Sequence, residues 1–158
     1  MTSLKTVPAL LVSVFVLIAA VATASTGTLT QAESSLLGAV NQARIDHGLQ
    51  PLRPDQTLER AARAHSADMI RNRYFAHGAF MQRLSAFGAR GRILGENLAW
   101  GTGTDARATT ILAAWLASPE HRANLLRAAF QRIGIGALRG TFQGNGDALV
   151  ITADFSGG

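Results

Sequence analysis

Two segments in the first half of the chain place apolar residues at intervals of three and four positions, which predicts amphipathic helices. The first covers about residues 33–47 and ends at Gly48, a residue type that commonly stops a helix. The second begins at Asp55, whose carboxylate suits an N-cap, and continues to about Asn72. Residues 49–54 are expected to be extended because each residue before a proline avoids the helical region. The apolar faces consist of Leu36, Leu37, Val40 and Ala43 in the first helix and of Leu58, Ala62, His65 and Met69 in the second.

The middle of the chain has a weaker pattern. Residues 78–94 contain several glycines and arginines, so we expect a long loop with one helical turn at about residues 81–87. Residues 94–101 are mainly aliphatic or aromatic and are bounded by glycine, which indicates a strand that carries Glu96 near its start.

Two more helices are predicted after this strand. The first follows a cap at Thr104 or Asp105, ends near residue 117 and buries Ile111, Leu112 and Trp115. The second starts with Ser118-Pro119-Glu120, which supplies a serine N-cap, a proline at the first helical position and an acid at the positive end of the helix. His121 is therefore expected in its first turn.

The C-terminal residues alternate with a period of two, which is the pattern of β-strands. We expect strands at residues 132–138 and 148–155, joined by a turn at Gly144-Asn145-Gly146-Asp147. Helices first and a hairpin last predict an α+β fold with an antiparallel sheet.

The N-terminus has the pattern of an export signal. Lys5 precedes an apolar run over residues 7–22, and Ala22-Thr23-Ala24 has the small residues that signal peptidases accept. We therefore expect a signal peptide over residues 1–24 with cleavage after Ala24, a spacer over 25–32, and one domain over 33–158 that is secreted as a monomer. An uncleaved membrane anchor is the alternative, although the run is shorter than the usual ~20 apolar residues.

Composition narrows the function classes. The chain of 158 residues carries fifteen basic and ten acidic side chains, and its only lysine lies in the predicted signal. The arginines are spread over every segment and no nucleic-acid motif is present, so DNA or RNA binding is not expected. Because the chain has no cysteine, an exported domain must be stable through core burial alone, and a lipid anchor on cysteine is excluded.

Three side chains are the candidates for chemistry: His77, Glu96 and His121. Imidazole and carboxylate groups bind zinc-like ions or exchange protons near neutral pH. Their spacing is too long for one helix face, so only the fold can bring them together.

The motifs around these residues resemble the bacterial, YkwD-like branch of the CAP superfamily, which includes cysteine-rich secretory, antigen 5 and pathogenesis-related 1 proteins. The resemblance runs from about Leu36 to Phe155 and rests on Tyr74-Phe75-Ala76-His77, Gly95-Glu96-Asn97, Trp115 with Ser118-Pro119-Glu120-His121-Arg122-Ala123-Asn124, and Ile133-Gly134-Ile135-Gly136. It implies an α-β-α sandwich, with a small antiparallel sheet between helices and a cleft for two histidines and up to two acids, often around a divalent metal.

By this resemblance His77, Glu96 and His121 form the cleft, and two interpretations are open: they bind a divalent ion such as zinc, with no organic cofactor, or they form a hydrogen-bonded trio without a metal. The second family acid, three residues after a tryptophan, is replaced by Ser118. Glu120 is a possible substitute acid, although it points about 100° away from His121 on a helix. Asn97, Ser118, Arg122 and Asn124 are expected to support the cleft.

Three function classes remain open at this point. A non-enzymatic binding module for a small lipid-like or cell-envelope ligand is favoured, because one family acid is missing and no Gly-x-Ser-x-Gly nucleophile motif occurs. The alternatives are a metal-assisted hydrolase with Glu96 as base, and a structural or interaction domain whose site is vestigial.

Overall fold

The structure is a computed structural model, and it describes residues 28–158. The predicted signal peptide over residues 1–24 and the first residues of the predicted spacer lie outside this range. Within residues 28–158, no helix combines the length and the apolar character that crossing a membrane requires.

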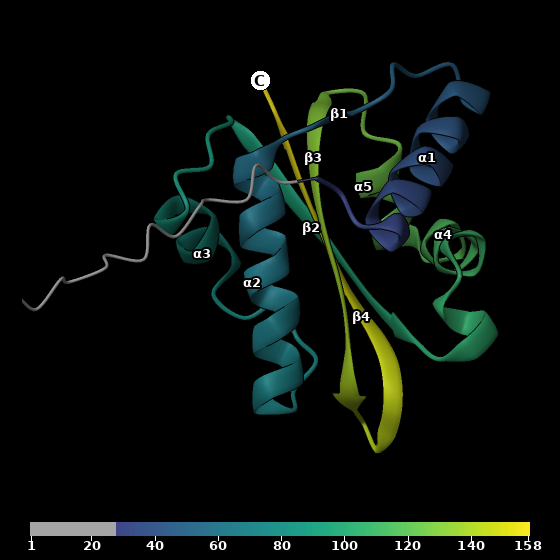
Figure 1. The fold of residues 1–158 in the computed structure, drawn as a ribbon. Helices are drawn as coiled ribbons and strands as arrows, with labels where there is room; N and C mark the ends of the chain where they lie inside the picture. Colours follow the sequence, from purple (N-terminus) through teal and green to yellow (C-terminus); the bar gives the residue numbers. More distant parts are fainter. Residues whose placement is uncertain (1–27) are drawn as a thin grey trace, which may run out of the picture.

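The described residues form three layers, with a sheet between two groups of helices (Figure 1). Helices α2 and α3 cover one face of the sheet, and α1, α4 and α5 cover the other. The strand order is β1-β3-β4-β2. The elements are α1 (Gln31–Asp46), β1 (Arg53–Pro54), α2 (Gln56–Asn72), α3 (Phe80–Ala86), β2 (Ile93–Gly101), the 3₁₀ helix η1 (Gly103–Ala106), α4 (Ala108–Ala117), α5 (Pro119–Leu125), β3 (Phe130–Phe142) and β4 (Asn145–Gly157).

The predicted α-β-α sandwich is confirmed, and its sheet is mixed. The strands β2, β4 and β3 are antiparallel neighbours, whereas the two-residue β1 pairs with β3 in parallel. Both long predicted helices are present. Thr30 and Glu33 form a capping box at the start of α1, Gly48 follows its end with a φ of 72°, and Asp55 caps α2.

The predicted cap of the third helix is wrong. Thr104 and Asp105 do not cap the third helix: they lie in η1, and α4 begins after Arg107. The chain turns tightly here because η1 packs directly against β2. Gly101 allows this contact, since a Cβ at this position would be 2.5 Å from the Asp105 carbonyl oxygen.

The hairpin turn is also shifted by one residue from its predicted start. Phe142 pairs with Asn145, so the loop consists of Gln143 and Gly144, which both have positive φ. The Asn145 side-chain amide donates to the Gln143 carbonyl at 3.0 Å and closes the turn. Two central residues with positive φ are typical of the type I′ turn, whose twist matches that of a hairpin.

Close contact between β3 and α2 fixes the layer spacing on one side of the sheet. A Cβ on Gly134 or Gly136 would overlap the backbone of α2, so these glycines allow the helix to lie against the strand. On the other face, Ile133 and Ile135 point into the largest apolar core, together with Trp115. The sheet is therefore buried on both faces.

Buried charged groups attach the helices to one another. The Glu33 carboxylate in α1 accepts two hydrogen bonds from Arg63 in α2, at 2.6 and 2.7 Å. Arg44 in α1 is 1% exposed and donates to the carbonyls of Leu125, Arg127 and Phe130, where α5 ends and β3 begins. Arg44 thus positions the segment that carries α5.

Candidate functional site

His77 and Glu96 meet at the edge of the sheet. His77 lies in the loop between α2 and α3 with its side chain 56% exposed, whereas the Glu96 side chain on β2 is 2% exposed. The His77 Nδ1 is 2.7 Å from Glu96 Oε1. Arg83 on α3 donates through Nη2 to the other oxygen, Oε2. Both oxygens of Glu96 are therefore occupied, one by an imidazole and one by a guanidinium.

A second buried acid lies beside Glu96. Asp154 on β4 is the residue directly opposite Glu96 in the antiparallel pair, and it is 0% exposed. Its Oδ1 is 3.9 Å from Arg83 Nη2, and no N–H donor among the described residues hydrogen-bonds to either of its oxygens, so its carboxyl interacts directly with that of Glu96. Neither Arg83 nor Asp154 was predicted as a site residue from the sequence.

The two carboxyl groups resist ionisation. Burial raises the pKa of Glu96 well above its usual range, against the opposing charge of Arg83. Burial also raises the pKa of Asp154, and the negative charge of Glu96 adds to this effect. One guanidinium next to two buried carboxyls favours a state in which one of the acids keeps its proton.

His121 is held by Ser118 instead of by an acid. Its Nδ1 lies 2.9 Å from the Ser118 hydroxyl. Ser118 occupies the predicted N-cap position of α5 and Pro119 begins the helix, but the Ser118 hydroxyl makes no capping bond and is directed to the imidazole. Burial lowers the pKa of His121, and the charge of His77 lowers it further. Both effects favour the neutral ring near pH 7.

An amide pair connects α5 to β2. Asn97 is fully buried, and its side-chain nitrogen donates to the His121 carbonyl at 3.0 Å. Asn124 donates to the Asn97 side-chain oxygen at 2.9 Å and to the Glu96 carbonyl at 3.2 Å. The two asparagines hold the helix that carries His121 against the strand that carries Glu96.

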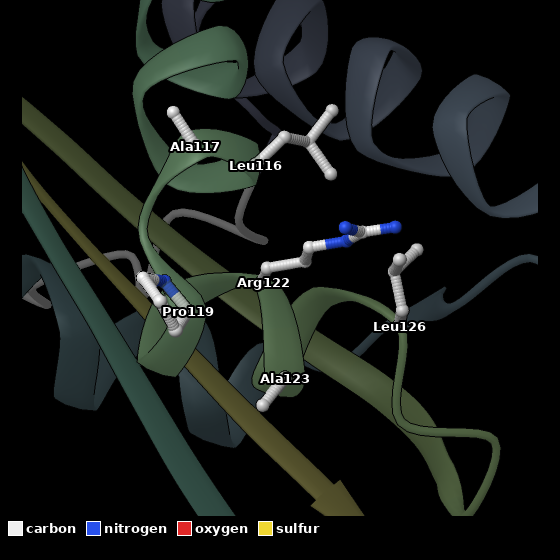
Figure 2. A pocket seen from close by; sticks show the side chains of 6 residues that line it. All are labelled: Leu116, Ala117, Pro119, Arg122, Ala123 and Leu126. Atoms are coloured by element: carbon white, nitrogen blue, oxygen red, sulfur yellow. The ribbon is translucent and has the colours of Figure 1, made fainter.

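The other two predicted supporting residues make no side-chain hydrogen bond within the cleft. The Glu120 side chain is exposed and has no hydrogen bond or ion pair with another described residue, although its charge raises the pKa of His121 against the larger effect of burial. Arg122 is also exposed and lines a separate pocket of about 440 Å³ between α4 and α5, where its guanidinium extends toward Leu126 and Leu116 (Figure 2).

An apolar groove of about 530 Å³ lies beside His121, between β2 and α4. We call it the β2–α4 groove. Two of its wall residues are large and exposed, Phe75 at 41% and Trp100 at 37%. Their rings each make an edge contact with Phe142. The groove is lined by Phe75, Leu98, Ala99, Trp100, Asp105, Thr110, Ile111, Ala114, Trp115, Ser118 and His121.

The three predicted metal ligands are not arranged around a common point. Among residues 28–158, no three His, Asp or Glu side chains are grouped closely enough to hold an ion. His77 and Glu96 contact each other, Arg83 occupies the second oxygen of Glu96, and the Nδ1 of His121 is on Ser118. This arrangement does not fit a zinc ion shared by His77, Glu96 and His121, so a metal at this site stays a prediction.

The buried acids predict how stability depends on pH. A carboxyl whose pKa is higher in the folded than in the unfolded chain stabilises the fold below its ordinary pKa of about 4, and this stabilisation is lost as the pH rises through the folded value. We expect these two carboxyls to lower the free energy of unfolding as the pH rises from about 4 to their folded pKa values, about 7 for Glu96 and about 8 for Asp154, by at most about 1.4 kcal/mol per pH unit and group. Urea denaturation at several pH values measures this.

Asp154→Asn is the matched variant for this measurement, because it removes one titrating group without changing its size. Its unfolding free energy is expected to vary less over the same pH range. An equal pH dependence in the wild type and in Asp154→Asn would contradict the raised pKa of Asp154.

Known proteins with similar sequences place this chain in a family. The model of the cysteine-rich secretory protein family, CAP, matches residues 37–155. The protein YkwD from Bacillus subtilis is 34% identical over 119 residues, which are 72% of this chain and 45% of YkwD. The membrane protein YlbC from the same organism is 34% identical over 115 residues, 70% of this chain and 32% of YlbC. The chain thus spans less than half the length of either curated relative.

Solved structures agree with this assignment. An extracellular protein from Bacillus anthracis that contains an SCP domain has a TM-score of 0.68 and 27% identity, with 84% of this chain and 45% of that chain covered. An outer surface protein from Borrelia burgdorferi has the same TM-score and 25% identity, with 82% and 95% covered. The match to the family model, the likeness to YkwD and this shared architecture mean that the chain belongs to the cysteine-rich secretory protein (CAP) family.

Proposed function

We propose that this protein is an exported, non-enzymatic binding module that holds a small apolar or amphipathic molecule of the cell envelope in the β2–α4 groove. The observation that carries the proposal is the groove itself: about 530 Å³ with apolar walls, next to His121 and Ser118. Such a volume lies in the usual range of small-molecule sites.

The apolar and the polar lining residues of the groove suit different parts of one amphipathic ligand. Covering Phe75 and Trp100 removes exposed aromatic surface from water, which is worth about 25 cal/mol per Å² of apolar area. The Ser118–His121 pair adds hydrogen-bonding groups to the lining of the groove. An acyl chain with a polar head satisfies both requirements.

Export is part of the proposal. It rests on the apolar N-terminal run with its Ala22-Thr23-Ala24 site. It is also supported by the extracellular and outer-surface origins of the similar solved structures.

The test is calorimetric titration of the purified protein with two probes, decanoic acid and decanol. Ala114 is an exposed residue of α4 that lines the groove, so Ala114→Phe fills the groove with a ring. We expect this variant to lose about tenfold or more in affinity for both probes, or about 1.4 kcal/mol.

Ala113→Phe is the matched control. Ala113 is exposed, adjacent on the same helix and absent from the groove lining. Its variant is expected to bind like the wild type. The proposal is wrong if neither probe binds the wild-type protein, or if both alanine variants bind equally well.

A further inference from the structure

The positively charged Arg83 side chain lies beside the two buried carboxyl groups of the cleft. Its side chain is 13% exposed, and it contacts Glu96 and approaches Asp154, which are 2% and 0% exposed. Two carboxyl groups buried this deeply are stable only beside positive charge or as neutral acids. Arg83 is the group that makes ion pairs with both.

We propose that Arg83 is the resident cation of this cleft. Its guanidinium takes the place of a divalent metal, balances the charge of the two buried carboxyls and excludes zinc from Glu96. The proposal concerns Arg83, Glu96 and Asp154, and it does not depend on any ligand in the β2–α4 groove.

The contacts of Glu96 support exclusion. A zinc ion within bonding distance of either Glu96 oxygen would displace His77 or Arg83, or would lie close to a guanidinium of like charge. In addition, His77 directs Nδ1 toward the carboxylate, so its other nitrogen, Nε2, lies across the ring from Glu96. His77 and Glu96 therefore do not face one common point.

Removing the Arg83 guanidinium would leave the two buried carboxyl groups without their positive partner. Glu96 and Asp154 are directly opposite each other on β2 and β4, and His77 is next to Glu96. Without Arg83, the two buried carboxylates would lie beside the space left by a positive charge, and carboxylate oxygens are donors that zinc accepts. Arg83→Met retains most of the apolar stem, so we expect this substitution to create a zinc site.

The experiment is calorimetric titration of the full chain with Zn²⁺ at pH 7. We expect Arg83→Met to bind zinc at least about tenfold more tightly than the wild type. The gain should disappear in Arg83→Met/Glu96→Gln. Arg90→Met, which removes an exposed arginine from the loop after α3, is the control and should bind zinc like the wild type.

A second comparison does not depend on the folding of Arg83→Met. Since the proposal excludes zinc from Glu96 in the wild type, Glu96→Gln alone should leave the zinc affinity unchanged. A tenfold or greater loss in this single variant would show that Glu96 already binds zinc beside Arg83, and it would overturn the proposal. An unchanged zinc affinity in a folded Arg83→Met protein would overturn it as well.

Discussion

Gly136→Ala is expected to destabilise the protein by about 3 kcal/mol, although it adds a single methyl group. The new Cβ would overlap the backbone of Ala62 and Arg63 in the middle of α2. Backbone atoms cannot move aside as the end of a side chain can, so the whole helix must shift away from β3 and open the core below it. Chemical denaturation of the variant and the wild type measures the effect.

Gly38→Ala is the control, because Gly38 lies in α1 and a Cβ there meets nothing within 4 Å. Alanine is favoured over glycine in a helix, so this variant should be more stable by up to about 1 kcal/mol. A loss of less than about 1 kcal/mol in Gly136→Ala would mean that α2 does not lie against the strand as described.

Arg44→Met is expected to cost about 3 kcal/mol or more, because it removes a buried donor from several carbonyl groups at once. Arg44 donates to the Gln50 carbonyl at 2.9 Å and to Leu125 at 2.7 Å, and it reaches the carbonyls of Arg127 and Phe130. Methionine fills much of the volume but leaves these acceptors without the guanidinium. The loss should appear in urea denaturation.

The same variant should also loosen α5, since Arg44 holds the end of this helix. Hydrogen exchange of the α5 amides is expected to be faster in Arg44→Met than the global loss of stability explains. Arg60→Met, at an exposed position of α2, is expected to stay within about 0.5 kcal/mol of the wild type. Equal unfolding free energies for the two variants would contradict a structural role for Arg44.

Most helices and strands were predictable, because apolar spacing and capping residues within each segment determine them. The apolar spacing of α1 and α2 and the caps at Asp55 and Gly48 decided where these helices begin and end. The parallel pairing of β1 with β3 was not predictable, since Arg53 pairs with Arg132 far along the chain and two residues carry no periodic signal. The hairpin turn moved by one residue because Gly144 takes the left-handed conformation at the second loop position.

The site was only partly predictable. Family resemblance identified His77 and Glu96, and the structure brings them together; spacing along the chain would not have done so. Asp154 was overlooked because strand alternation does not distinguish an exposed polar residue from one on a central strand that helices cover on both faces. Its register opposite Glu96 becomes visible only when the strands are paired. Arg83 lies in the segment over residues 78–94, whose weak pattern predicts one helical turn but does not distinguish Arg83 from the other arginines there.

The most direct test of the proposed binding function is to find where a probe binds. In a titration of isotope-labelled protein with decanoic acid, the largest amide shift changes should occur at Leu98, Trp100, Ala114 and His121, around the β2–α4 groove. Changes centred on Leu116, Arg122 and Leu126, around the pocket of Figure 2, would contradict the proposal, and so would the absence of any change.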